Sequence, residues 1–103
     1  MLVSVPSTKN WNYAKHNAVA ETAKVLGIDY VDMNTLREEI PINWNTDTRD
    51  KGDHLNYFGA VKATEYFGKY LEEKRIFSDK RKLNEYKYWN STADEFLSSV
   101  EKV

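Results

Sequence analysis

A strand–helix–strand pattern at the start of the chain most constrains what it can fold into. Leu2 to Val5 is a short, mostly apolar run that ends at Pro6, as expected for a buried strand. Apolar residues then recur at helical spacing from Tyr13 to Leu26, and Gly27 follows where a helix commonly ends. Ile28 to Met33 has the composition of a second strand. Because two strands joined through a helix lie parallel with a right-handed crossover, the pattern predicts an α/β fold with a small parallel sheet and flanking helices.

Two capping-box patterns, each a Thr followed three residues later by a Glu, indicate further helix starts. Thr35 with Glu38 predicts a short helix that ends near Ile40. Thr92 with Glu95 predicts the start of the last helix. Together with one long helix in the middle of the chain, these patterns predict four helices beside the sheet.

A polar loop and then the long helix occupy the middle of the chain. Pro41 to Asp53 shows no periodicity, and loops of that length usually have a function. Apolar residues return at helical spacing from Leu55 to Leu71. We expect residues 1–71 to form one domain. Residues 72–103, which are rich in charged and aromatic side chains, are expected to form a helical extension that packs on it.

Composition narrows the classes of function. The 103 residues include 15 basic and 16 acidic ones, and this near-neutral balance argues against nucleic-acid binding, which needs a cationic surface. The absence of cysteine excludes disulfides, thiolate zinc sites and a cysteine nucleophile. No apolar run approaches the roughly 20 residues of a membrane span. The first residues lack the features of a signal peptide, which leaves the compartment open, and no cofactor or metal ion is expected.

The segment from Asp50 to His54 carries the candidate chemistry. It places an acidic loop and a histidine just before the long helix. A serine hydrolase uses an imidazole as general base and a carboxylate that fixes the tautomer of that ring. In open α/β folds such groups collect in loops at the carboxyl ends of the strands. Asp50 is the favoured carboxylate because Gly52 lets the loop fold back toward the ring, and Asp53 is the rival.

A longer pattern around the histidine resembles a known family. The run Asp50-(x)3-His54-Leu55-Asn56-(x)2-Gly59-Ala60 is similar to the last conserved block of SGNH/GDSL hydrolases, and Gly68-Lys69-Tyr70-Leu71 matches the helix end that follows it in many bacterial members. The resemblance implies part of the flavodoxin-like, three-layer fold of that family. It also implies hydrolysis of an acylated carbohydrate or a small ester, with His54 as general base and Asn56 near the substrate.

The nucleophile of that family has no counterpart in this chain. In family members the serine and the oxyanion-binding glycine and asparagine lie far N-terminal of the histidine, and neither Ser4 nor Ser7 is part of a Gly-Asp-Ser turn. The spacing from Asp50 to His54 is one residue longer than usual. Because the missing groups supply most of the rate, we expect no hydrolysis by the chain alone. The first strand would keep an unpaired apolar edge, so we expect a homo-oligomer or a second chain that supplies the missing half.

Other interpretations of these residues stay open. His54 could cap the next helix or pair with a carboxylate without catalysis, and the chain could be a non-enzymatic remnant that binds carbohydrate or protein. Trp44, in the loop before His54, is the best candidate for stacking on a ligand. His16 is interpreted as a surface or packing residue. The loop that starts at Asp47 fails as a calcium site, because arginine and lysine stand at ligand positions.

Overall fold

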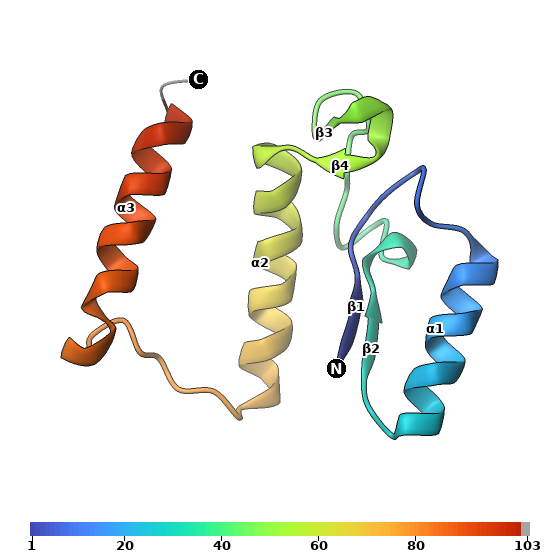
Figure 1. The fold of residues 1–103 in the computed structure, drawn as a ribbon, viewed down its shortest axis with the longest axis horizontal. Coiled ribbons are helices and arrows are strands. Elements are labelled where there is room, and N and C mark those ends of the chain that lie inside the picture. The colour runs from blue at the N-terminus through green and yellow to red at the C-terminus, as the bar shows by residue number, and fades with distance from the viewer. Residues whose placement is uncertain (102–103) are drawn as a thin grey trace. The chain divides into compact units, whose positions relative to one another are not determined.

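A β–α–β unit forms the first part of the chain in the computed structural model, which describes residues 1–101 (Figure 1). Strand β1 (Leu2–Ser4) leads through helix α1 (Tyr13–Leu26) to strand β2 (Tyr30–Asp32). The two strands pair in parallel, with Val3 opposite Val31. The predicted α/β character and the parallel pair are therefore confirmed, although the second strand is shorter than the sequence pattern indicated.

Helix α1 has the predicted bounds because both of its ends are set by local residues. The side chain of Asn12 accepts a hydrogen bond from the backbone N–H of Lys15 at 2.8 Å and caps the first turn. At the other end Gly27 adopts φ 65°, and its N–H reaches the carbonyl groups of Ala23 and Lys24. Ala23 is the buried residue of this helix.

The short helix predicted from Thr35 to Ile40 is wrong. A single 3-10 turn, η1 (Met33–Thr35), begins earlier, because the carboxylate of Asp32 accepts a hydrogen bond from the backbone N–H of Asn34 at 2.9 Å. The hydroxyl of Thr35 donates to the carbonyl of Asp32 at 2.8 Å instead of accepting from the backbone ahead of it. The capping-box pattern is therefore overridden by an aspartate at the end of the strand.

The segment predicted as an aperiodic loop contains a small hairpin. Strand β3 (Thr48–Arg49) pairs antiparallel with β4 (His54–Leu55), and the 3-10 turn η2 (Asp50–Gly52) joins them. Asp50, Lys51 and Gly52 all have positive φ, at 53°, 56° and 92°. His54 thus lies on a strand, and three left-handed residues reverse the chain just before it.

Helix α2 (Tyr57–Lys74) confirms the predicted long helix with both ends shifted toward the C-terminus. Asn56 sets its start, because the side-chain oxygen of Asn56 accepts a hydrogen bond from the N–H of Gly59 at 3.2 Å. Gly59 is buried, and a Cβ at this position would collide with the backbone carbonyl of Asp47. Lys62, one turn along, pairs with the carboxylate of Asp47 at 2.6 Å and fastens the preceding loop to the helix.

The apolar core of this part of the molecule is small. The buried apolar residues are Ala23, Val31, Met33, Ile40 and Ala63. Among residues 1–101, no large side chain is less than 2% exposed. In the described sheet β1 pairs only with β2, and Val3 and Val5 on that strand and its extension are 39% and 56% exposed. One edge of the sheet therefore presents apolar surface and unpaired backbone groups to solvent.

The chain divides into two compact units between Lys69 and Tyr70, within α2. The second unit contains the 3-10 turn η3 (Asn84–Tyr86) and helix α3 (Lys87–Glu101). The prediction that Thr92 starts this helix is wrong, because its hydroxyl donates to the carbonyl of Tyr88 inside the helix at 2.8 Å. The described chain therefore has three α-helices, not four. None of the helices within residues 1–101 combines the length and apolarity needed to cross a bilayer.

Candidate active site

The imidazole of His54 lies beside two carboxylates of the hairpin turn. Its Nδ1 is 2.9 Å from Oδ2 of Asp50 and 3.6 Å from Oδ2 of Asp53. Both members of the closer pair are open to solvent, with 57% of the His54 side chain and 62% of the Asp50 side chain exposed. The left-handed conformation of Asp50 and Lys51 bends the chain so that the carboxylate four residues earlier reaches the ring. With Nδ1 bonded to a carboxylate, Nε2 is the nitrogen available to take a proton.

The second carboxylate has a different set of contacts. Asp53 accepts a hydrogen bond from the hydroxyl of Ser7 at 3.3 Å and another from the side-chain amide of Asn10. Next to it, the backbone N–H and the hydroxyl of Thr8 donate to the carbonyl of Gly52 at 3.0 and 3.1 Å. These contacts dock the hairpin on the loop that follows β1. The histidine therefore stands near the carboxyl end of the parallel sheet, where ligand sites of open α/β folds occur.

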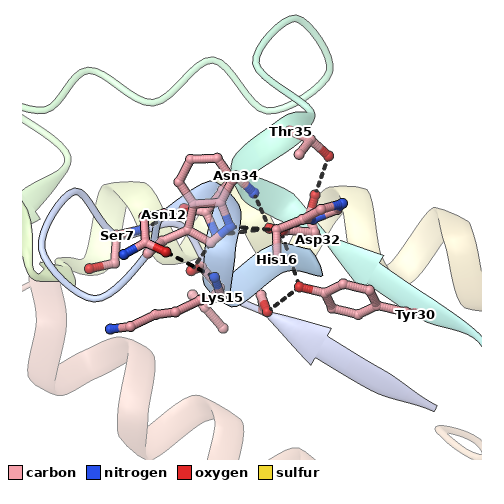
Figure 2. A network of polar contacts seen from close by, with 11 residues as sticks. Ser7, Asn12, Lys15, His16, Tyr30, Asp32, Asn34 and Thr35 are labelled. Carbon is pink, nitrogen blue, oxygen red and sulfur yellow. Dashed lines mark hydrogen bonds and ion pairs between the residues drawn. The ribbon is translucent and has the colours of Figure 1, made fainter. Parts of the chain in front are cut away.

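A second histidine–aspartate pair was missed by sequence reasoning, which interpreted His16 as a surface or packing residue. Figure 2 shows Asp32, at the end of β2, with His16 of α1, Tyr30 of β2 and Asn34 of η1 around its carboxylate. Its Oδ2 lies 2.6 Å from Nδ1 of His16, and it accepts from the indole N–H of Trp11 at 2.7 Å and the hydroxyl of Tyr30 at 3.1 Å. Its Oδ1 accepts from the backbone and side-chain N–H groups of Asn34, both at 2.9 Å.

The electrostatics of this network indicate that Asp32 is ionised and structural. Burial by itself would raise the pKa of Asp32, but the hydrogen bonds from His16, Asn34 and Trp11 outweigh burial and hold that pKa below its usual range. Burial raises the pKa of Tyr30, and the neighbouring carboxylate of Asp32 adds to the rise. Both oxygens of Asp32 are occupied by protein donors. The group therefore joins β2 to α1 and to the turn after the strand.

The structure separates the two residues predicted to bind substrate. Trp44 is 41% exposed and lines a pocket of about 470 Å³ that Ser7 and Thr8 also border. Asn56 instead uses both ends of its amide in the fold: its oxygen caps α2, and its nitrogen donates to the carbonyl of Thr46 at 2.7 Å. Trp44 is therefore exposed at the wall of a pocket, and its contact with a ligand stays a prediction, whereas the described contacts of Asn56 are structural.

Neither N-terminal serine is arranged as a nucleophile. The hydroxyl of Ser4 is hydrogen-bonded to the hydroxyl of Tyr30 at 2.7 Å, and that of Ser7 to Asp53. Over the described part of the chain, no serine hydroxyl is hydrogen-bonded to a histidine, and no cluster of three or more acidic or histidine side chains has the arrangement of a metal site. Comparison with protein-family models, with curated proteins and with solved structures found no match to this chain.

Proposed function

We propose that residues 1–71 are the C-terminal part of an SGNH/GDSL-type serine hydrolase, which removes an ester-linked or O-linked acyl group once a second stretch of polypeptide supplies the nucleophile. The observation that carries the proposal is the contact of 2.9 Å between Nδ1 of His54 and Oδ2 of Asp50, on a solvent-exposed hairpin. Such a pair is the base-and-orienter half of a catalytic triad. The sequence pattern around His54 supports the same assignment.

In this mechanism His54 acts through Nε2. It takes the proton of a serine hydroxyl while the serine oxygen attacks the acyl carbonyl, and it returns that proton to the alcohol that leaves. A water molecule then gives a proton to the same nitrogen and attacks the acyl-serine. As the acid leaves, Nε2 passes that proton to the serine oxygen, which restores both the serine and the neutral imidazole. Asp50 holds the proton on Nδ1 throughout and stabilises the imidazolium that forms.

The small core and the free edge of β1 support the proposal that residues 1–71 are one part of a larger sheet fold. Val3 and Val5 leave apolar surface exposed beside a strand whose outer backbone groups lack a partner in the described sheet. We propose that further parallel strands continue from this edge and that helices cover both faces, as in the flavodoxin-like, three-layer fold. In that arrangement the nucleophile would follow one of the added strands at the same end of the sheet as His54.

The test is to co-express the chain with the polypeptide encoded directly upstream and to treat the purified assembly with a fluorophosphonate probe. The proposal predicts that a serine of the upstream polypeptide is labelled, and that His54→Gln slows the labelling by at least about 100-fold. Asp53→Asn is the matched control and should slow it far less. An upstream region without a reading frame that contains a strand followed by Gly-Asp-Ser would count against the proposal, as would labelling that His54→Gln leaves unchanged.

A second candidate, a non-enzymatic domain that binds carbohydrate, is favoured by one observation. Residues of this chain alone form a pocket of about 470 Å³ beside the exposed Trp44. If the chain is such a domain, it binds its ligand alone and no partner makes it hydrolytic. The co-expression experiment therefore separates the two candidates.

A further inference from the structure

The pocket beside Trp44 lies where both parallel strands end. Its wall includes Pro6 to Thr8, which follow β1, and Met33 and Asn34, which follow β2. Ligands of open α/β sheets bind at this end of the strands. The volume of about 470 Å³ falls within the range of small-molecule sites, about 300–1,000 Å³.

Aromatic rings line the pocket and are held in place by the fold. The indole of Trp11 is fixed by its 2.7 Å bond to Asp32 and packs edge-to-face on Tyr13 with ring centroids 4.8 Å apart. The backbone around Trp44 is fixed by the hydroxyl of Thr48, which donates to the Trp44 carbonyl at 2.5 Å. An exposed aromatic face such as that of Trp44 suits the apolar face of a sugar ring.

Arg37 gives the pocket its charge. It is the one charged side chain that lines the described pocket, and it is exposed. Within residues 1–101 it has no ion pair or side-chain hydrogen bond, so its guanidinium keeps its donors for a ligand. A guanidinium matches the two oxygens of a carboxylate. No acidic side chain lines the pocket to compete for it.

We propose that this pocket binds a sugar residue that carries a carboxylate, with the ring face on Trp44 and the carboxylate on Arg37. Ser7 and Thr8 line the pocket and also bond to the segment before His54. The loop that follows β1 therefore joins the pocket wall to the turn before His54. Binding of the acidic sugar does not depend on the proposed function. Its hydrolysis does, and the two together name the substrate class as an O-acylated acidic polysaccharide.

The experiment is calorimetric titration of the full chain with an oligogalacturonide and with a neutral maltooligosaccharide of the same length. We expect saturable binding of the acidic sugar and binding of the neutral sugar that is about tenfold weaker or more. Arg37→Gln should remove this preference, and Trp44→Ala should weaken binding of both sugars. Arg49→Gln is the charge control, because Arg49 is exposed on β3 and does not line the pocket. Circular dichroism checks that each variant is folded.

Three outcomes would overturn the inference: no saturable binding of either sugar in the millimolar range, equal binding of both sugars, or a preference that Arg37→Gln leaves intact. The two proposals stay separable because the titration uses the chain alone, which is expected not to hydrolyse any ester, and binding is read without a reaction. If binding follows these expectations and the co-expressed assembly still shows no hydrolysis, the proposed reaction fails and the inferred site stands.

Discussion

Asp53 is the sequence neighbour of His54, yet its carboxylate bonds to Ser7 and Asn10, while Asp50, four residues back, lies closest to the imidazole at 2.9 Å. Asp53 lies between the turn η2 and β4, and its Oδ2 is 3.6 Å from Nδ1, so the nearer residue in sequence is the farther one in space. The two aspartates therefore have separable roles, one that orients the ring and one that holds the hairpin.

The first prediction concerns the tautomer of His54 and needs only the isolated chain. Because Asp50 accepts a hydrogen bond at Nδ1, the neutral ring should carry its proton on that nitrogen. Asp50→Asn should shift the population toward the tautomer protonated at Nε2, whereas Asp53→Asn should leave it nearly unchanged. Long-range proton–nitrogen spectra of the histidine rings measure both. Equal effects of the two substitutions would contradict the assignment of Asp50.

The second prediction concerns stability and reverses the order of the same two residues. Asp53→Ala removes the acceptor for Ser7 and Asn10 and should lower the free energy of unfolding by about 1–2 kcal/mol. Asp50→Asn removes the charge of a solvent-exposed partner of His54 but keeps a residue type that tolerates the positive φ of this position, and it should cost less than about 0.5 kcal/mol. Urea denaturation compares the two variants. A larger loss for Asp50→Asn would refute the structural role given to Asp53.

The third prediction follows from the lowered pKa of Asp32. Because its pKa in the folded chain lies below that of the unfolded chain, its contribution to stability is fully present above about pH 4 and is lost as the pH falls through the folded value. Asp32→Asn should therefore cost about 2 kcal/mol at neutral pH and progressively less in acid. Urea denaturation at a series of pH values measures this, with Glu38→Gln as a charge control. A cost that stays constant below pH 4 would count against the network.

The fourth prediction uses two glycines of one helix. At Gly59 a Cβ would meet the carbonyl of Asp47, so Gly59→Ala should destabilise the chain by about 1–3 kcal/mol. At Gly68 a Cβ would meet nothing within 4 Å, so Gly68→Ala should stabilise it by up to about 1 kcal/mol through helix propensity. Thermal unfolding followed by circular dichroism gives both signs. The same sign for both substitutions would mean that the loop does not approach α2 at Gly59.

The fifth prediction concerns self-association through the free edge of β1. Without a partner that completes the sheet, the isolated chain should form oligomers whose mass rises with concentration. Val3→Lys should shift it toward monomer, because a lysine on an edge strand opposes pairing, and Val25→Lys on α1 should not. Light scattering after size-exclusion chromatography decides this. A monomer at every concentration would contradict the prediction.

The elements that the sequence predicted correctly are those with local determinants. Asn12 and Gly27 lie next to the helix that they end, and the two strands around α1 follow from hydrophobic pattern alone. Thr35 does not cap a helix, because the carboxylate of Asp32, which lies outside the capping-box pattern, accepts a hydrogen bond from the backbone N–H of Asn34. The hairpin before His54 was missed because it depends on Asp50 and Lys51 in left-handed conformations that these residue types rarely adopt.

In the candidate site, too, the contact between residues close in sequence was predicted and the contact between distant residues was not. The pairing of Asp50 with His54 could be anticipated because Gly52 allows the turn between them. The contact of His16 with Asp32 could not, since it exists only when the parallel pairing of β1 and β2 sets α1 beside the end of β2. The one signal in the sequence was Asp32 itself, an acidic residue at the carboxyl end of a predicted strand. The hydrogen bonds of the structure assign that residue to a structural network.

If His54 is the general base of a hydrolase that another polypeptide completes, the rate of p-nitrophenyl acetate hydrolysis depends on both. We expect no turnover above background by the chain alone, clear turnover by the assembly with its upstream partner, and a loss of about 1,000-fold or more on His54→Gln. Turnover by the chain alone that His54→Ala abolishes, or turnover by the assembly that His54→Gln leaves intact, would contradict this expectation.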